Sequence, residues 1–293
     1  MHTDVDRDDR QRRRILPRPP LACFWRQLAT GMAAAVPCLC TPASVLAGAW
    51  TPPQGDSYNK LAFNFFYADS TFGPSAPGFQ YFSNVNLTYY GEYGLLDDLT
   101  LFGSLPLARI AQRQNQLTTD TWGVGDVELG TRYRLLLEPL VVSGQFIYKF
   151  PYLYDADDSL PLGNGQNDFD FRALFGKSLG RFGYAGLELG YRLRLGAPSD
   201  EFRYLVEYGI EPLDQFYLRT KLDGILGLNN GDPTRDSSGN PTLANQFDLG
   251  KVEFTAGYEV VEHWFLEFTA TPNLYGSNTL RGGNLQFAVI YAN

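Results

Sequence analysis

The pattern that most constrains the fold of this chain is an alternation of apolar and polar residues over segments about as long as one β-strand. In "FGYAGLELGYRLRLG" (182–196), one set of alternate residues is apolar, namely Ala185, Leu187, Leu189, Tyr191, Leu193 and Leu195. The other set carries the charges of Glu188, Arg192 and Arg194. Successive side chains of a strand point to opposite faces, so this strand has one apolar and one charged face.

Segments of this kind recur along the chain, with turn residues between them. We predict twelve, at residues 58–68, 80–93, 98–109, 122–136, 139–150, 168–179, 182–196, 202–211, 215–226, 246–259, 262–273 and 283–292. Their length suits tilted strands that cross a bilayer, which need about 9–11 residues. In the body of the chain no apolar run reaches the roughly 18 residues of a helical span.

The connections between the segments alternate in length. Long polar stretches such as "STFGPSAPG", "AQRQNQLTTDT" and "NNGDPTRDSSGNPTLAN" alternate with short ones such as "LEP" and "VVEH". An outer-membrane β-barrel has this alternation because short periplasmic turns face one end and longer extracellular loops the other. An even number of strands places both ends of the barrel on the side of the short turns.

Two arrangements of the alternating faces are open from periodicity alone. In a soluble β-sandwich the apolar faces would form the core and the charged faces would meet water. In a membrane barrel the apolar faces meet lipid and the charged faces line a lumen. The loop pattern favours the barrel, so the predicted fold class is an all-β transmembrane antiparallel barrel of about twelve strands in the bacterial outer membrane.

The candidate pore-lining residues of this barrel carry both signs of charge. They are Asp126, Glu128, Arg132, Arg134, Asp170, Arg172, Glu188, Arg192, Arg194, Arg203, Glu207, Arg219, Lys221, Asp223, Lys251, Glu253 and Glu267. Buried charge is costly unless it is paired or hydrated, so we expect ion pairs, water, or both. Only about eight residues lie between position 50 and the first strand, so we expect any constriction from lumen side chains or from an inward-folded loop, 151–167 first and 228–245 next.

Tyrosines recur just before the short turns. They are Tyr93, Tyr133, Tyr208, Tyr258 and Tyr291. Ordinary strand propensity would account for them singly. Their shared position favours an aromatic girdle at one membrane interface, where an amphipathic ring is stable.

The N-terminal region has the order of an export signal. Several arginines precede an uncharged, moderately apolar stretch that ends in small residues. We therefore predict a signal peptide over 1–49 and the barrel over 50–293, with cleavage after Ala49 or, nearly as well, after Ala47. A disordered tail or a membrane anchor is the alternative, although Pro37 and Pro42 would interrupt a long helix. All three cysteines lie before residue 41, so the barrel has none.

Three stretches resemble a known family. "WGVGDVELGTRYRLL" (122–136), "GAWTPPQG" (48–55) and "YGEYGLLDDLTLFGSLPL" (90–107) resemble the outer-membrane proteins of the meta-pathway of phenol degradation group, which includes XagA-like barrels. The resemblance implies an outer-membrane barrel through which small compounds pass, aromatic or hydrophobic ones among them. The partners implied are outer-membrane lipid and lipopolysaccharide, a small-molecule solute and the barrel assembly machinery.

Other chemistry has little support in the sequence. The net charge of −8 and the lack of basic clusters outside the first residues argue against nucleic-acid binding. We predict no enzyme, no metal and no cofactor, since the barrel segment holds a single histidine, His263, in a short turn. The acidic stretch "DADDSLPLGNGQND" lacks the glycine and glutamate of a calcium loop, which leaves a weak cation site at lipopolysaccharide as a minor alternative.

Two functions remain. The first is a channel or transporter for small molecules with a charged lumen. The alternative is a structural or accessory envelope protein, in surface polysaccharide export or adhesion, whose lumen is closed by ion pairs.

Overall fold

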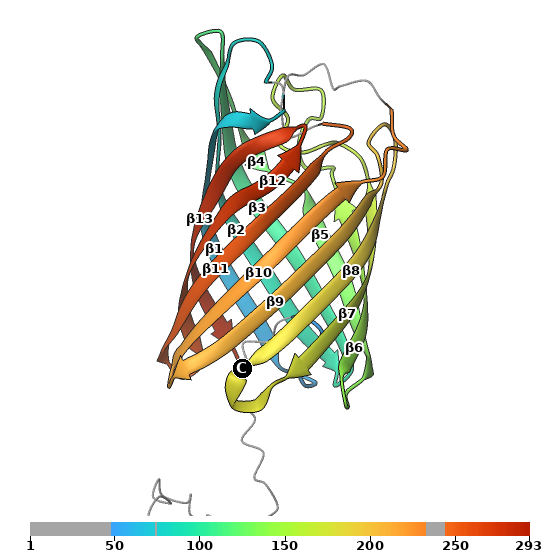
Figure 1. Ribbon diagram of the computed structural model, residues 1–293, viewed down its shortest axis with the longest axis vertical. Helices are drawn as coiled ribbons and strands as arrows, with labels where there is room; N and C mark the ends of the chain where they lie inside the picture. Colours follow the sequence, from blue (N-terminus) through green and yellow to red (C-terminus); the bar gives the residue numbers. More distant parts are fainter. Residues whose placement is uncertain (1–47, 74, 233–243) are drawn as a thin grey trace, which may run out of the picture. The chain divides into compact units, whose positions relative to one another are not determined.

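The computed structural model describes residues 48–73, 75–232 and 244–293. The described part is an antiparallel β-barrel (Figure 1). Its strands are Ser57–Phe72 (β1), Phe79–Leu96 (β2), Leu99–Gln114 (β3), Leu117–Val124 (β4), Val127–Leu136 (β5), Val141–Phe150 (β6), Asp168–Ser178 (β7), Tyr184–Arg194 (β8), Glu201–Leu213 (β9), Phe216–Gly227 (β10), Asp248–Val261 (β11), Trp264–Ser277 (β12) and Thr279–Ala292 (β13). Its helical content is one 3-10 turn, Gly180–Phe182. The predicted signal peptide lies outside the described residues, apart from positions 48 and 49.

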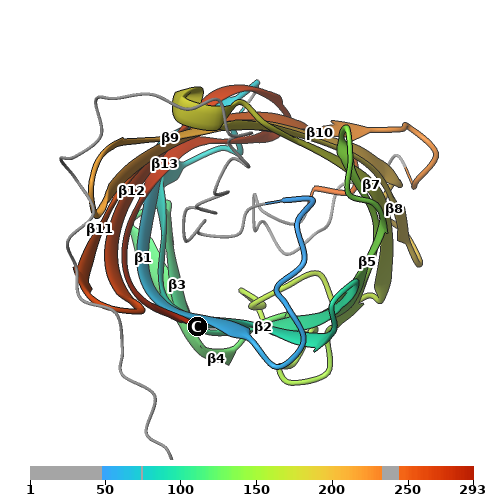
Figure 2. The same cartoon turned by 90° about the horizontal axis from the view of Figure 1, so that it is seen from below.

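The sheet closes on itself. Each strand from β5 onward pairs with the next, and β13 pairs with β1. The pairs β1–β2 and β2–β3 then complete the ring, which Figure 2 shows end-on. β4 and β5 both pair with β3, one above the other, so together they occupy one position in the wall. The barrel therefore has twelve wall positions, and the predicted fold class is correct.

Pro106 lies at the break between β4 and β5. On this side of β3 the pairing with β4 begins at Leu107, and the pairing with β5 begins at Ser104. A proline in a closed sheet removes one hydrogen-bond donor, which is tolerated at an irregularity of the ladder. Here the Pro106 carbonyl accepts a 3.0 Å hydrogen bond from the Gly125 amide, inside the break itself.

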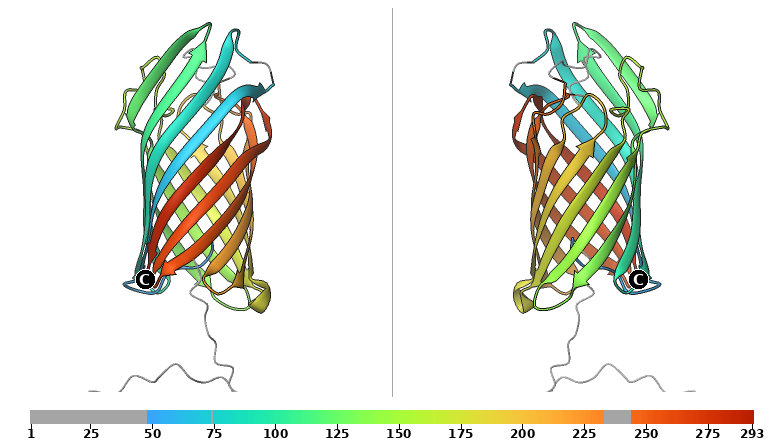
Figure 3. Two further views of the ribbon diagram at one scale, coloured as in Figure 1. Left: turned by 90° about the vertical axis from the view of Figure 1, so that its left-hand side faces the viewer. Right: turned by 90° about the vertical axis from the view of Figure 1, so that its right-hand side faces the viewer.

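Two of the predicted long loops are strand instead. The stretch "AQRQNQLTTDT" forms the ends of β3 and β4, joined by a two-residue turn with φ of 51° at Asn115 and 68° at Gln116. This hairpin and the start of β2, which pairs with it, rise above the other strand ends (Figure 3). Likewise, a single residue, Asn278, separates β12 from β13. The prediction was wrong here because strand pairing continues above the bilayer, where lipid no longer imposes apolar alternation.

The two faces of the wall differ in composition. Leu187 and Leu189 on the outer face are 36% and 38% exposed, whereas Arg192 and Arg219 on the inner face are 7% and 8% exposed. Large apolar side chains cover the outside, and many of the buried side chains are polar or charged. This inverts the arrangement of a soluble sandwich and suits a wall surrounded by hydrocarbon. In the part of the chain that the structure describes, no helix has the length and apolarity to cross a membrane.

Candidate functional site

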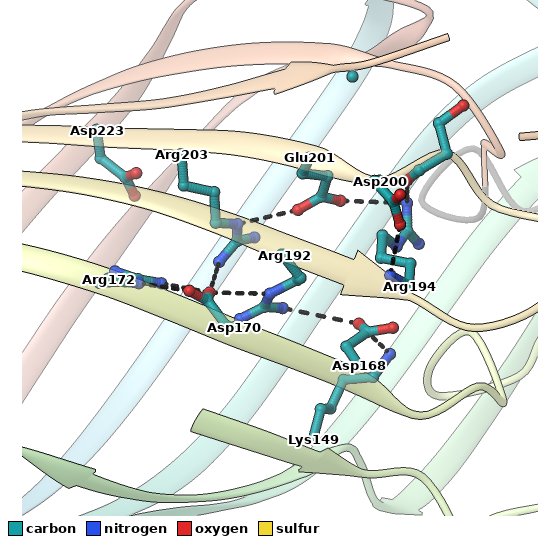
Figure 4. Close-up of polar contacts among 12 residues, drawn as sticks. Lys149, Asp168, Asp170, Arg172, Arg192, Arg194, Asp200, Glu201, Arg203 and Asp223 are labelled. Atoms are coloured by element: carbon teal, nitrogen blue, oxygen red, sulfur yellow. Dashed lines mark hydrogen bonds and ion pairs between the residues drawn. The ribbon is translucent and has the colours of Figure 1, made fainter. Parts of the chain in front are cut away.

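The interior of the barrel contains a connected set of ion pairs centred on Asp170, here called the Asp170 network (Figure 4). Register brings its members together, since Asp170 on β7 lies opposite Arg192 on β8. The Asp170 carboxylate accepts hydrogen bonds of 3.0 Å from Arg192 Nε and 2.9 Å from Arg172 Nη2. With 1% exposure, Asp170 is stable as an anion only because these guanidinium groups replace its water.

The Asp170 network extends in both directions around the wall. On one side Arg192 pairs with Glu128, 3.0 Å away across two intervening strands, and lies 3.8 Å from Asp168, which binds Lys149 at 2.9 Å. On the other side Arg203 binds Glu201 at 2.9 Å. Further members are Arg172–Glu188 at 3.0 Å, Arg194–Glu201 at 3.1 Å and Lys149–Asp126 at 3.2 Å. The network thus joins the inner faces of strands β5 to β9.

A second group, the Glu267 network, lies on the inner faces of strands β1 and β9 to β12. Glu267 accepts from Lys60 on β1, from Arg219 on β10 at 3.3 Å and from the Tyr217 hydroxyl at 2.8 Å. Its side chain is fully buried. Neighbouring members are Arg219–Glu253 at 3.5 Å and Lys221–Glu207 at 3.1 Å. Lys60 reaches Glu267 across the inner face of β13, the strand between β1 and β12.

A third pair joins Arg132 on β5 to Glu92 on β2. Two guanidinium nitrogens lie 3.1 and 3.2 Å from the two carboxylate oxygens, which is the bidentate geometry that Arg favours. Both side chains are 6% exposed. Arg132 also donates to the Trp50 carbonyl at 2.9 Å, so it ties the barrel wall to the segment before β1.

Some interior charges reach solvent inside the barrel. Lys251 and Asp223 pair at 2.8 Å with side chains 31% and 37% exposed, and Glu128 is 34% exposed. These residues face inward, on the same strand faces as the buried networks. Side chains therefore do not fill the interior at this level, as expected for twelve strands, a size between filled eight-stranded barrels and open porins.

The wall formed by β13, β1 and β2 is neutral at mid-height. An amide cluster is built around Asn64, whose side-chain oxygen accepts from Asn284 at 3.1 Å and from Gln286 at 2.8 Å. The Asn64 amide in turn donates to Asn86 at 2.9 Å. This wall presents hydrogen-bonding groups without charge, in contrast with the ion-paired wall of β5 to β9.

The predicted pore-lining residues all lie on inward-facing positions, and all but Arg134 take part in ion pairs. Arg134 is half-buried, and within the described residues its side chain has no ion pair. Sequence reasoning missed Lys60, Lys149, Glu201 and the amide cluster. In β1 the apolar residues Leu61, Phe63 and Phe65 alternate with the inward ones, so the same alternation argument would have identified Lys60 and Asn64 as inward-facing. Whether the whole set lines a conducting pore stays a prediction.

The extracellular end of the lumen contains an apolar site. Leu160, from the connection between β6 and β7, is 2% exposed and packs against inner-wall residues of four other strands. These are Ala68, Phe82, Ile110 and Leu280, each at most 3% exposed. The loop is held beside β5 by a 2.5 Å hydrogen bond from Tyr154 to Asp126. Loop 151–167, the first candidate for a constriction, therefore folds inward and places Leu160 against the opposite inner wall.

At the periplasmic end, the residues before β1 cross the opening of the barrel (Figure 2). Ala49 is buried against Val141 and Leu174, on β6 and β7. Trp50 packs edge-on against Tyr184, with ring centroids 5.6 Å apart. The sequence argument allowed a constriction only from lumen side chains or a loop, and this was wrong. The expectation rested on the small number of residues before the first strand, but the nine residues from Gly48 to Asp56 are enough to cross the mouth.

The five tyrosines of the predicted girdle lie at this periplasmic end. Tyr93 pairs with Ser57 and Tyr133 with Leu99, at the first residues of their neighbouring strands. Tyr93, Tyr133, Tyr208 and Tyr258 are 43–49% exposed, and Tyr291 is half-buried against Trp264. The rings thus share one level of the outer surface. Their contact with a membrane interface remains a prediction.

Two ionisable side chains outside the membrane-spanning segments, Asp200 and Tyr154, have hydrogen-bonded environments that shift their pKa values. Burial alone would raise the pKa of Asp200, but hydrogen bonds from Tyr191 at 2.6 Å, the Arg194 amide and Asn230 lower this pKa below its usual value. Burial, and the hydrogen bond to Asp126, raise the pKa of the Tyr154 hydroxyl. Among the described residues, no three His, Cys, Asp or Glu side chains form a group that could hold a metal ion.

A closed barrel with an apolar exterior and an ion-paired interior defines an outer-membrane β-barrel protein. By structure, the chain is similar to the COG4313 outer membrane channel from Pseudomonas putida F1, with a TM-score of 0.68 and 19% identity over 86% of this chain and 99% of that one. It is also similar to the translocator domain of the autotransporter NalP from Neisseria meningitidis, with a TM-score of 0.53 and 12% identity over 82% and 89%.

These likenesses establish the fold. A closed antiparallel barrel with an apolar outer face of this kind belongs to the bacterial outer membrane. By sequence, no family model matches the chain, and no curated protein matches it.

Proposed function

We propose that the protein is a passive outer-membrane channel for small, water-soluble molecules. The observation that carries the proposal is that inward-facing charges reach solvent inside the barrel, at Lys251, Asp223 and Glu128. A lumen that served only to brace the wall would bury such side chains against one another. The predicted set of pore-lining residues would then surround the path.

The solute class follows from the two interior walls. One wall offers guanidinium, ammonium and carboxylate groups, and the other offers the amide cluster. A solute with a polar or charged group can exchange its water for these groups, whereas an aliphatic solute would find apolar contact in separate clusters, such as those around Leu160 and Ala49. The resemblance to the phenol meta-pathway group adds aromatic acids and phenols, whose polar group suits this lining. Membership of that group and an XagA-like role are part of the proposal.

Reconstitution of the purified barrel tests the proposal. In planar bilayers we expect discrete conductance steps, and in liposomes we expect uptake of benzoate and of a small neutral sugar. Because cations and anions balance along the lining, we expect weak ion selectivity in a salt gradient. Lys251→Glu should shift the reversal potential in the direction of cation selectivity, and Asp223→Lys should shift it in the direction of anion selectivity.

The alternative is a structural or accessory envelope protein. The observation in its favour is the segment of the chain folded into each mouth, with Leu160 at one end and Trp50 at the other. This alternative requires no conductance, no solute uptake and a defect of surface polysaccharide or adhesion in a deletion strain. Conductance with a normal surface would refute it.

A further inference from the structure

The segment from Gly48 to Asp56 places its first residues inside the barrel mouth, whereas Pro53, Gln54 and Gly55 are exposed. It enters β1 at Ser57, yet its first residues contact strands β5 to β8 on another part of the wall. Hydrogen bonds fix the stretch between: the Thr51 hydroxyl donates to the Asp97 carbonyl at 2.8 Å, and the amides of Gly55 and Gly94 donate to Gly94 and Asp56 carbonyls. The segment is therefore part of the folded barrel.

Ala49 is among the most deeply buried residues of the described chain, at 1% exposure. Its methyl group packs against Val141 and Leu174, and its carbonyl accepts a hydrogen bond from the Ser143 hydroxyl. Ser143 is itself 1% exposed, so without Ala49 a buried hydroxyl would lose its acceptor. The wall is built to receive Ala49.

The barrel also makes room for Trp50. A Cβ atom on Gly176 would lie 2.6 Å from the Trp50 ring, so a residue larger than glycine would displace the indole. The Trp50 carbonyl accepts from Arg132, whose charge lies beside it. Cleavage after Ala49 would create a free ammonium group on Trp50. That group would lie in an apolar cluster and next to the Arg132 cation, and both neighbours disfavour a positive charge.

Gly48 has a different environment. It is half-buried, adopts a φ of 65°, and an added Cβ would lie 3.8 Å from Glu188 Oε1. Glu188 projects from β8 and is 13% exposed, with Arg172 on its other oxygen. An ammonium group at Gly48 would find a carboxylate within reach in a partly dry interior, where such a pair is strong.

We propose that signal peptidase hydrolyses the peptide bond between Ala47 and Gly48, and that the new ammonium group of Gly48 pairs with Glu188 inside the barrel. Water supplies the hydroxyl group to the Ala47 carbonyl carbon, and the Gly48 nitrogen leaves as an amine that is protonated. The proposal takes residues 1–47 as an export leader. The sequence allows cleavage after Ala49 or after Ala47, and the proposal selects Ala47. It also gives Gly48, the first mature residue, a role in anchoring the segment.

The first test is the N-terminus of the protein isolated from outer membranes after expression of the full chain. Intact mass and N-terminal sequencing should find Gly48 as the first residue. A chain that begins at Trp50, or one that retains residues before Gly48, would overturn the proposal. This result does not depend on conductance, so it is independent of the proposed channel function.

The second test addresses Glu188. In the folded barrel we expect slow acylation of the α-amine by an amine-reactive reagent, and a pKa of that amine above the usual value of about 8. Glu188→Gln should raise the acylation rate severalfold and return the amine pKa to its usual value, and Glu188→Asp should restore part of the protection. Glu262→Gln is the matched control, because Glu262 is 90% exposed in a periplasmic turn. Equal rates in wild type and Glu188→Gln would exclude the pairing.

Discussion

Each mouth of the barrel contains a docked segment of the chain, and the two segments are held by different interactions. At the extracellular end, an apolar side chain from a loop packs against apolar residues of the wall, and Leu160 itself contributes no polar anchor. At the periplasmic end, backbone carbonyls of the segment before β1 accept hydrogen bonds from Ser143 and Arg132. Packing is non-directional and roughly proportional to area, whereas these hydrogen bonds hold one geometry. The extracellular contact is therefore the easier one to open.

The largest effect is expected at the periplasmic mouth. Arg132→Ala removes one partner of a buried bidentate pair and leaves the Glu92 carboxylate without compensation. Such a loss costs about 3–5 kcal/mol of the free energy of unfolding. Urea titration of the barrel in lipid vesicles measures it. Arg134→Ala is the control, since Arg134 has no ion pair with a described residue. Equal stabilities of the two variants would mean that the pair does not support this mouth.

The next effect is expected at the extracellular mouth. Leu160→Ser replaces a buried apolar side chain and should weaken loop docking by about 2–3 kcal/mol. If the loop restricts passage, single-channel conductance or open probability should rise severalfold, with little change in barrel stability. Leu153→Ser, at a position 52% exposed in the same loop, should leave both unchanged. An unaltered conductance in Leu160→Ser would remove the loop from the path.

A smaller effect isolates the hydrogen bond to Ala49. Ser143→Ala leaves the buried carbonyl of Ala49 without its donor and should cost about 1 kcal/mol. Proteolysis of the isolated barrel should then cleave the segment before β1 faster than in the wild type. If the rate stays the same, apolar packing of Ala49 and Trp50 alone holds the segment, and the two mouths are more alike than the contacts indicate.

The smallest effect concerns pH and a polar anchor at the extracellular end. Because the folded state lowers the pKa of Asp200, this carboxylate stabilises its turn at pH values above the unfolded pKa of about 3.9. That stability is lost as the pH falls through the lower, folded value. Asp200→Asn should abolish this dependence below about pH 4. Hydrogen exchange of the Arg194 and Asp200 amides measures it, and Asp158→Asn, in an exposed loop, should behave as the wild type.

Much of the barrel interior could be predicted from the sequence, because the face to which a side chain points depends only on its position along its own strand. Arg192 and Leu193 point to opposite sides in any strand, so the inward set followed from alternation once lipid was assigned to the apolar face. Partners could not be predicted in the same way. Lys60 and Glu267 are 207 positions apart and meet past an intervening strand only because the barrel closes with one register.

The break at Gly125 shows a limit of alternation. Strict alternation through Asp126 and Glu128, both in the predicted pore-lining set, would place Val124 on the charged face as well. In the structure Val124 pairs with the outward Leu107, and the inward set begins again after the break. An irregularity of one residue moves every following side chain to the other face, and no composition signal marked it.

The sequence by itself therefore determined a barrel of about twelve strands, each with an apolar face toward lipid and a charged face toward the lumen. The facing of each side chain depends only on the period of two along a strand and on the solvent that each face meets. Only the tertiary structure decided which charges pair, that Leu160 fills one mouth and that Trp50 enters the other. Those contacts depend on closure, strand register and the inward path of two irregular segments, for which neighbouring residues along the chain carry no information.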